Sequence, residues 1–86
     1  MKIVYHQRFL KGFQKLPGKI QGRFFERIKL FQREPFHPLL NNHSVEPTYP
    51  SWRSINITGD YRALYEVPKE GLVVFMKIGT HSELYG

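Results

Sequence analysis

The sequence predicts an α+β fold with elements in the order β-α-α-β-β-β, an antiparallel sheet that carries a helical hairpin on one face. Three observations predict it. Apolar residues recur at helical spacing in two segments of the first 33 positions, a proline-rich stretch follows, and three β-type runs separated by turn residues come last. Because the chain has 86 residues, we expect one core and a single domain, 1–86.

The first half of the chain predicts a short strand and two helices. Residues 2–5 are β-branched and aromatic, as is typical of a strand. The apolar periodicity of 7–16 predicts an amphipathic helix that ends before Pro17, without a good N-cap residue at its start. A second helix is predicted over 18–33, and the Pro-Gly corner favours an antiparallel hairpin. The two apolar stripes comprise Phe9, Leu10, Phe13 and Leu16, then Ile20, Phe24, Ile28 and Phe31, with Phe25 and Leu30 widening the second.

The second half predicts a long loop followed by a three-stranded meander. Prolines and asparagines mark a loop of about 16 residues over 35–50, a length typical of functional or mobile loops. Runs at 52–57, 61–67 and 72–78 predict strands. Trp52, where the loop enters the sheet, is expected to be a packing anchor. The face of the sheet away from the helices stays open, and we expect function there.

The turn between the first two strands of the meander decides which residues share a face. A two-residue turn at 59–60 would place Asn56 and Arg62 on opposite faces. A three-residue loop at 58–60 pairs Asn56 with Arg62 instead. We predict the three-residue loop, because only this register gives the hairpin one apolar and one polar face. The residues then expected under the helices are Ile55, Ile57, Ala63, Tyr65 and Val67.

Composition narrows the class of protein. Thirteen Lys and Arg against seven Asp and Glu give a net charge of +6, which indicates an anionic partner, either nucleic acid or an acidic protein. At 41% hydrophobic residues the chain is too apolar for a disordered basic tail. The lack of cysteine excludes disulfides and thiolate chemistry and suits a reducing compartment. Since no segment predicts a membrane span or a signal peptide, we expect a cytoplasmic protein without a membrane partner.

Side chains able to carry chemistry gather in the second half. The four histidines lack the spacing of a metal motif, and no phosphate loop or serine-hydrolase elbow is present, so we expect neither metal nor cofactor. Histidines that move protons, an arginine that binds phosphate and an aromatic ring that stacks on a base suit metal-free RNA cleavage. The candidates are His43, Asn56, Asp60, Arg62, His81 and Tyr85, with His6 and His37 as lesser ones.

Each candidate also has an ordinary structural interpretation. A histidine in a loop is commonly solvated, Arg62 is an edge charge, Asp60 a turn residue and Asn56 a polar residue on a solvated face. Tyr85, close to the end of the printed sequence, is expected to fray. The Lys and Arg face of the second helix is most simply a solvated face.

Segments 52–65 and 78–85 resemble the RelE/ParE superfamily of toxins from type II toxin–antitoxin systems, above all its YafQ-like and RelE/StbE branch. The most specific motifs are the Gly-Asp-Tyr-Arg turn at 59–62 and the Gly-Thr-His-x-x-Leu-Tyr ending at 79–85. Length and element order extend the resemblance over essentially the whole chain. It implies a RelE-like microbial RNase fold and a ribosome-dependent mRNA interferase. Such a toxin contacts ribosomal RNA, cleaves mRNA in the ribosomal A site, and is neutralised by a cognate antitoxin.

The resemblance also implies roles for individual residues. His43 matches a loop histidine of the YafQ-like pattern, Asp60 its turn aspartate and His81 its late histidine, while Tyr85 matches the C-terminal aromatic. Asn56 replaces a strand histidine of that pattern, and an amide cannot titrate near neutrality. In the RelE-like branch an arginine contacts the scissile phosphate, and Arg62 of this chain matches it.

We therefore expect His43 to be the general base and His81 the general acid, two assignments that the sequence leaves exchangeable. Asp60 would orient a histidine or raise its basicity, Arg62 would stabilise the pentacoordinate phosphate, and Tyr85 would position a base. RNA binding is assigned to Ser54, Asn56 and Lys77.

Two alternatives remain open at the level of sequence. A ParE-like member would use the same fold to inhibit DNA gyrase without cleaving RNA, although the paired histidines and the terminal aromatic argue against it. A catalytically inactive scaffold would only bind an antitoxin or RNA, and Asn56 makes this alternative more credible.

Overall fold

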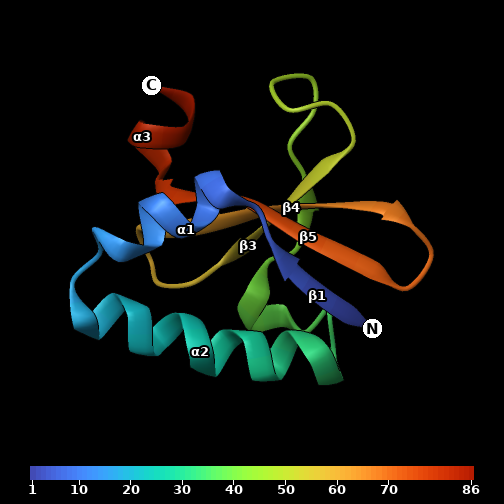
Figure 1. The fold of residues 1–86 in the computed structure, drawn as a ribbon, viewed down its shortest axis with the longest axis horizontal. Coiled ribbons are helices and arrows are strands. Elements are labelled where there is room, and N and C mark those ends of the chain that lie inside the picture. Colours follow the sequence, from blue (N-terminus) through green and yellow to red (C-terminus); the bar gives the residue numbers. More distant parts are fainter.

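The computed structural model describes residues 1–86 as a five-stranded sheet flanked by helices (Figure 1). It contains the predicted β-α-α-β-β-β order and adds three short elements, two inside the expected long loop and one at the C-terminus. No helix combines the length and the apolar character that crossing a membrane would require. The elements are β1 (Lys2–Tyr5), α1 (Gln7–Gln14), α2 (Gly18–Arg33), the 3₁₀ helix η1 (Pro38–Leu40), β2 (His43–Ser44), β3 (Trp52–Asn56), β4 (Tyr61–Lys69), β5 (Leu72–Thr80) and α3 (His81–Tyr85).

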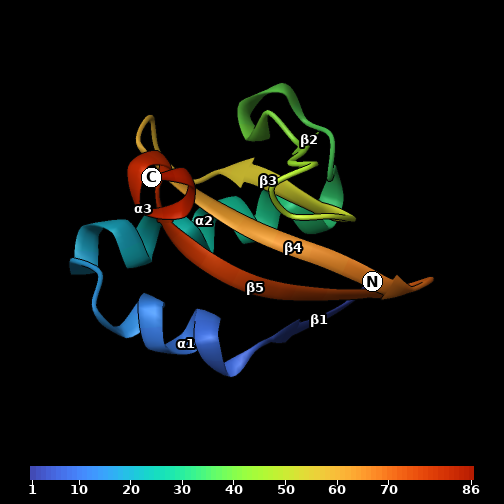
Figure 2. The same ribbon diagram turned by 90° about the horizontal axis from the view of Figure 1, so that it is seen from above.

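The strands lie in the order β1-β5-β4-β3-β2. β3, β4 and β5 form the expected antiparallel meander, and β2 adds antiparallel to its outer edge. β1 is the exception to the antiparallel pattern, because it pairs in parallel with β5 (Figure 2). β1 and β5 lie near opposite ends of the sequence. The two helices α1 and α2 follow β1 in the chain before the meander begins.

The two faces of the sheet carry different elements. In Figure 1, α2 lies below the sheet, whereas α3 and the loop that leads from β2 to β3 rise above it. The chain runs one way along α1 and returns along α2, so the two helices form the predicted antiparallel hairpin (Figure 2). One face is therefore covered by the helical hairpin, and the other is partly open.

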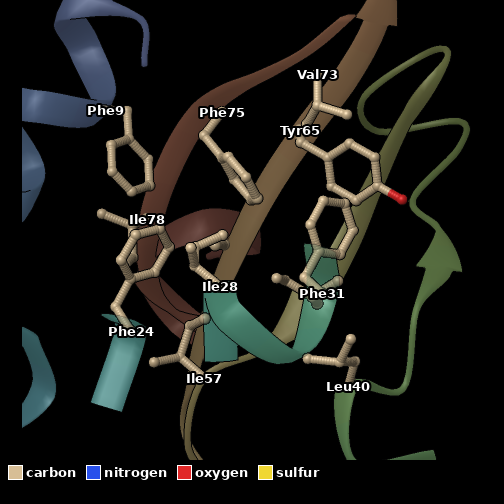
Figure 3. Packing of buried hydrophobic residues seen from close by; sticks show 12 residues of the cluster. Phe9, Phe24, Ile28, Phe31, Leu40, Ile57, Tyr65, Val73, Phe75 and Ile78 are labelled. Atoms are coloured by element: carbon tan, nitrogen blue, oxygen red, sulfur yellow. The ribbon is translucent and has the colours of Figure 1, made fainter. Parts of the chain in front are cut away.

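The core lies between the hairpin and the sheet and is built around aromatic rings (Figure 3). Phe24 of α2 packs between Phe9 of α1, at a ring-centroid distance of 5.3 Å, and Phe75 of β5, at 5.8 Å. All three side chains are at most 1% exposed. Leu10 and Phe25 were also expected on the apolar stripes, but they are largely exposed because they lie at the outer edges of the helical faces.

The structure confirms the predicted three-residue loop. Asn56 pairs with Arg62, and the backbone N–H of Ile57 donates to the carbonyl of Tyr61 at 2.9 Å, which closes residues 58–60 into the loop. Four of the five residues expected under the helices are buried in the core: Ile55, Ile57, Ala63 and Tyr65.

Val67, the fifth residue of that set, is wrongly predicted, because half of its surface is exposed. The pairing of β4 with β5 is irregular between Glu66 and Lys69, so the regular alternation of faces stops before Val67. Its side chain lines an open apolar hollow beside Phe36 instead of entering the core.

Two histidines act as helix caps. The Nδ1 atom of His6 accepts a hydrogen bond from the backbone N–H of Arg8 at 3.0 Å, so the expectation that α1 lacks a good N-cap is wrong. His37 does the same at the start of η1, where its Nδ1 accepts from the N–H of Leu39 at 3.1 Å. Neither histidine lines a cavity, so we assign both a capping role.

Candidate active site

A cavity of about 230 Å³ on the open face gathers most of the predicted catalytic residues. It contains four of the five predicted catalytic side chains together with one predicted RNA-binding residue, Ser54. Asp60, Asn56 and Lys77 do not line it. The lining residues are His43, Ser44, Val45, Glu46, Thr48, Ser54, Arg62, His81 and Tyr85.

Three parts of the fold bring these side chains together. β2 adds to the edge of β3 so that His43 pairs directly with Ser54. Arg62 enters from the start of β4, next to β3 in the sheet. α3 follows β5 without a break and carries His81 and Tyr85 onto the same side (Figure 1). The pairing of β2 with β3 places His43 in the cavity, and α3 places His81 and Tyr85 there.

The tautomer of the His43 ring is set by its own loop. Its Nδ1 lies 2.7 Å from the backbone carbonyl oxygen of Asn41. A carbonyl only accepts hydrogen bonds, so Nδ1 must carry the proton that it donates. In the neutral ring this leaves Nε2 as the unprotonated acceptor, which is the state that a general base needs.

The short helix α3 is held by a capping box. The Thr80 side chain accepts from the backbone N–H of Glu83 at 3.2 Å, and the Glu83 carboxylate accepts from the N–H of Thr80 at 2.7 Å. One turn of helix then places the rings of His81 and Tyr85 4.7 Å apart. The expectation that Tyr85 frays is therefore wrong, and the Thr-x-x-Glu pattern at 80–83 was the sequence signal that could have corrected it.

Tyr49 ties α3 to the loop between β2 and β3. Its hydroxyl donates to the carbonyl of Leu84, and the Lys77 Nζ donates to the Tyr49 oxygen at 3.1 Å while lying 5.0 Å from its ring centroid. Tyr49 also stacks on Trp52, with ring centroids 5.1 Å apart. The expected packing role of Trp52 is confirmed, and Lys77 is engaged in holding Tyr49. Beneath them lies a small core of Val45, Leu64 and Leu84.

Arg62 is anchored by one nitrogen. Its Nη1 donates to the backbone carbonyls of Thr58, Gly59 and Tyr61 at 3.0 to 3.2 Å. Nε and Nη2 make no hydrogen bond in the structure, so they are free to bind an anion in the cavity. The guanidinium thus has a fixed position and retains donors for a phosphate.

Tyr85 stays a neutral phenol at neutral pH. Burial raises the pKa of its hydroxyl above the usual 10.0, the neighbouring Tyr49 raises this pKa further, and Arg62 opposes the shift. The ring is available for stacking on a base, and its hydroxyl for donating a hydrogen bond.

Asp60 holds the start of α3 through its backbone carbonyl, not through its carboxylate. Its carbonyl accepts from the N–H of His81 at 3.3 Å, which fastens the β3–β4 loop to the start of α3. Its exposed carboxylate makes no hydrogen bond or ion pair, so the structure does not bring it to either histidine. The expected influence of Asp60 on a histidine stays a prediction.

Two polar side chains of β3 contain buried oxygens without partners. Ser54 is 1% exposed and its Oγ makes no hydrogen bond, although Ser54 lines the cavity. The Oδ1 of Asn56 is also buried and unpaired. Buried polar atoms are rarely left without a partner in native proteins, and a bound ligand is one source of such a partner. Asn56 lines a different hollow, between α2 and the β3–β4 loop.

The cavity also contains residues that sequence reasoning missed. Glu46 brings a carboxylate to its wall, and Ser44 and Thr48 bring hydroxyls. They lie in a proline-rich loop without a recognisable motif, so only the position of the loop reveals them. The molecule has no group of three or more His, Cys, Asp or Glu side chains arranged to hold a metal ion. The cavity thus brings together two imidazoles, a guanidinium and an aromatic ring.

Comparison of the sequence with family models gives one informative match. Residues 3–85 match the model described as the ParE toxin of the type II toxin–antitoxin system parDE. A comparison with curated proteins finds no match.

The fold is similar to those of several solved toxins. YafQ from Escherichia coli BL21(DE3) superposes with a TM-score of 0.82 at 18% identity, over 99% of this chain and 98% of that one. The YoeB/ParE toxin from Agrobacterium tumefaciens gives 0.76 at 20% identity, over 94% and 99%. A chain of the RelB–RelE antitoxin–toxin complex from Methanococcus jannaschii gives 0.74 at 20% identity, over 95% and 94%. The predicted RelE-like fold is confirmed.

Proposed function

The chain belongs to the ParE toxin family, within the RelE/ParE superfamily of type II toxin–antitoxin toxins, and we propose that it acts by cleaving mRNA on the ribosome without a metal. The observation that carries the proposal is the single cavity that joins His43, Arg62, His81 and Tyr85. These side chains supply the proton transfers, the phosphate contact and the base contact that RNA cleavage needs. The ribosomal substrate rests on the resemblance of the sequence to the RelE/ParE toxins.

The geometry suggests an order of events. The unprotonated Nε2 of His43 takes the proton of a ribose 2′-hydroxyl, and the resulting oxyanion attacks the adjacent phosphorus. Arg62 donates to the phosphate oxygens as negative charge grows on them. His81, in its protonated form, donates a proton to the departing 5′-oxygen as the P–O5′ bond breaks. A 2′,3′-cyclic phosphate and a free 5′-hydroxyl result, and Tyr85 holds a base in place by stacking.

We also propose a cognate antitoxin as partner. Solved structures with this fold include the E. coli DinJ–YafQ complex and the RelB–RelE complex of M. jannaschii. A net charge of +6 favours an acidic partner segment. Co-expression with the protein encoded next to it, followed by co-purification, tests this proposal.

Primer extension on mRNA bound to ribosomes tests the proposed cleavage. The wild-type protein is expected to cut the message, and His81→Gln to lose at least about a hundredfold in rate, the lower range for removal of a general acid. His37→Gln is the matched control, because it removes an imidazole whose ring caps η1 outside the cavity. Intact message with wild-type protein would overturn the proposal, as would equal cleavage by wild type and His81→Gln.

A second candidate function is inhibition of DNA gyrase. The match to the ParE family model favours it. A supercoiling assay with purified gyrase distinguishes the two activities. Loss of supercoiling with intact mRNA would replace the proposed activity, whereas growth without arrest together with antitoxin binding would indicate an inactive scaffold.

A further inference from the structure

The largest hollow of the molecule lies outside the candidate active site, between α2 and the β3–β4 loop, and has a volume of about 490 Å³. We call it the basic groove. Lys19, Arg23 and Arg27 form its wall on α2, and no carboxylate lines it. The remaining lining residues are Ile20, Leu39, Asn56, Ile57, Thr58 and Gly59.

The cations of the basic groove form a regular row. They follow one another at four-residue intervals, so successive side chains start about 6 Å apart along the helix axis. Like charges at this spacing repel one another, and only Arg23 has an ion-pair partner, Glu26, at 3.1 Å from Nε to Oε2. A row of cations matches a partner with repeated negative charges better than it matches one small anion.

Two residues that line the groove also contain buried polar atoms without a partner. The Nε of Arg27 and the Oδ1 of Asn56 are buried and have no partner in the structure. The Thr58 hydroxyl oxygen accepts from the N–H groups of Asp60 and Tyr61 at 3.2 and 3.1 Å, which leaves its proton free to donate. Phosphate oxygens only accept hydrogen bonds, so they match the Thr58 hydroxyl and the cationic side chains of the groove.

The β3–β4 loop connects the basic groove with the candidate active site. Asn56 lines the groove and pairs across the hairpin with Arg62, which lines the catalytic cavity. The Arg62 Nη1 also donates to the carbonyls of Thr58 and Gly59, two residues of the groove. A strand bound at Arg62 therefore needs only to pass this loop to reach the row of cations.

We propose that the basic groove binds the phosphodiester backbone of the substrate RNA next to the bond that is cleaved, an inference that rests on the proposed function. An acidic protein segment fits it less well. Docked protein segments are anchored by large apolar side chains in apolar pockets. Only three of the nine lining residues are hydrophobic, whereas exposed Phe36 and Val67 lie together in a different hollow.

Binding of fluorescent single-stranded RNA tests the proposal in a His81→Gln background, which prevents cleavage. Lys19→Gln/Arg23→Gln removes two cations from the groove. Lys29→Gln/Arg33→Gln is the matched control, because it removes one Lys and one Arg from exposed positions of the same helix outside the groove. Thermal melting followed by circular dichroism checks that both variants are folded.

RNA length separates the groove from the catalytic cavity. For an RNA of roughly 12 nucleotides, the groove variant is expected to bind about tenfold more weakly. The slope of the logarithm of the binding constant against the logarithm of the salt concentration should become shallower by about 1.4, which is about 0.7 for each lost phosphate contact of a single strand. For an RNA of roughly three nucleotides, which fits the cavity alone, its affinity should stay within about twofold of wild type. The control variant should stay within about twofold for both lengths.

Three results would overturn the proposal. Equal weakening by both double variants would mean that net charge alone binds RNA. A groove variant that loses only a Glu-rich peptide would indicate an acidic protein partner. Unchanged binding of free RNA with weaker binding to ribosomes would indicate ribosomal RNA instead. The proposed cleavage is judged separately, by primer extension with an intact His81. RNA binding without cleavage would contradict the proposed function and leave only RNA binding by the groove standing.

Discussion

The two faces of the sheet differ in how their residues are held. Under the helical hairpin, a core of 12 buried residues is fixed by the mutual packing of rings such as Phe9, Phe24 and Phe75. On the open face a core of only three buried residues supports side chains that depend on individual hydrogen bonds, such as those of Tyr49 and His43. The main core and the candidate chemistry therefore lie on opposite sides of one sheet, and an exposed side chain of the cavity should affect cleavage without affecting stability.

The largest expected effect separates activity from stability. His43→Gln should lower the cleavage rate about 10²- to 10⁴-fold, because the amide cannot take up a proton. Its urea midpoint should stay near that of wild type, since His43 is exposed. Parallel measurement of cleavage and urea unfolding checks this, and a large fall in the midpoint would contradict the separation of the two faces.

The covered face should respond in the opposite way. Phe24→Ala should cost about 3–5 kcal/mol of the free energy of unfolding, because it leaves a cavity among packed rings. Phe25→Ala is the control on the same helix, where 55% of the side chain is exposed, and should cost about 1 kcal/mol or less. Urea denaturation measures both, and similar losses would mean that the aromatic cluster is not the main source of stability.

A smaller effect should connect the loop to α3. Tyr49→Phe removes the hydroxyl that donates to Leu84 and accepts from Lys77, so we expect about 1 kcal/mol less stability. The cleavage rate should fall about tenfold at saturating substrate, because α3 then positions His81 and Tyr85 less well. Tyr61→Phe removes a hydroxyl that makes no hydrogen bond and should change neither quantity. Loss of activity in both variants would show that Tyr49 has no specific positioning role.

The smallest expected effect concerns a histidine outside the cavity. His6→Ala removes the cap of α1 and should cost about 0.5–1 kcal/mol of stability, with cleavage unchanged. His6→Asn should restore most of the loss, since asparagine caps helices well. Thermal melting measures both, and reduced cleavage by the stable His6→Asn protein would place His6 in the chemistry after all.

Local patterns predicted much of the fold. Apolar spacing located α2, and the residues around the β3–β4 loop predicted its register, which placed Asn56 and Arg62 on one face. Patterns failed where packing or pairing decides the outcome. Val67 follows strand alternation but lies beyond regular pairing, and the β2 pairing that brings His43 beside Ser54 involves only two residues of a proline-rich loop.

The sequence predicted which residues form the candidate site better than it predicted how their side chains are arranged. His43, Arg62, His81 and Tyr85 meet in one cavity, as the resemblance to RelE/ParE toxins implied. The carboxylate of Asp60 stays outside, and Lys77 holds Tyr49. These differences arise because a motif fixes which residues are present, whereas the direction of a side chain depends on neighbours distant in sequence.

The sequence by itself determined the α+β class, the family resemblance, the positive charge and the β3–β4 register, since each depends on residue type and short-range spacing. The tertiary structure decided which histidines face a cavity and which cap helices, because His6 and His43 differ in the backbone groups around them. It also decided that the cations of α2 face a groove beside the proposed catalytic cavity. Periodicity places side chains on one face of a helix, but only packing against the β3–β4 loop makes that face the wall of a groove.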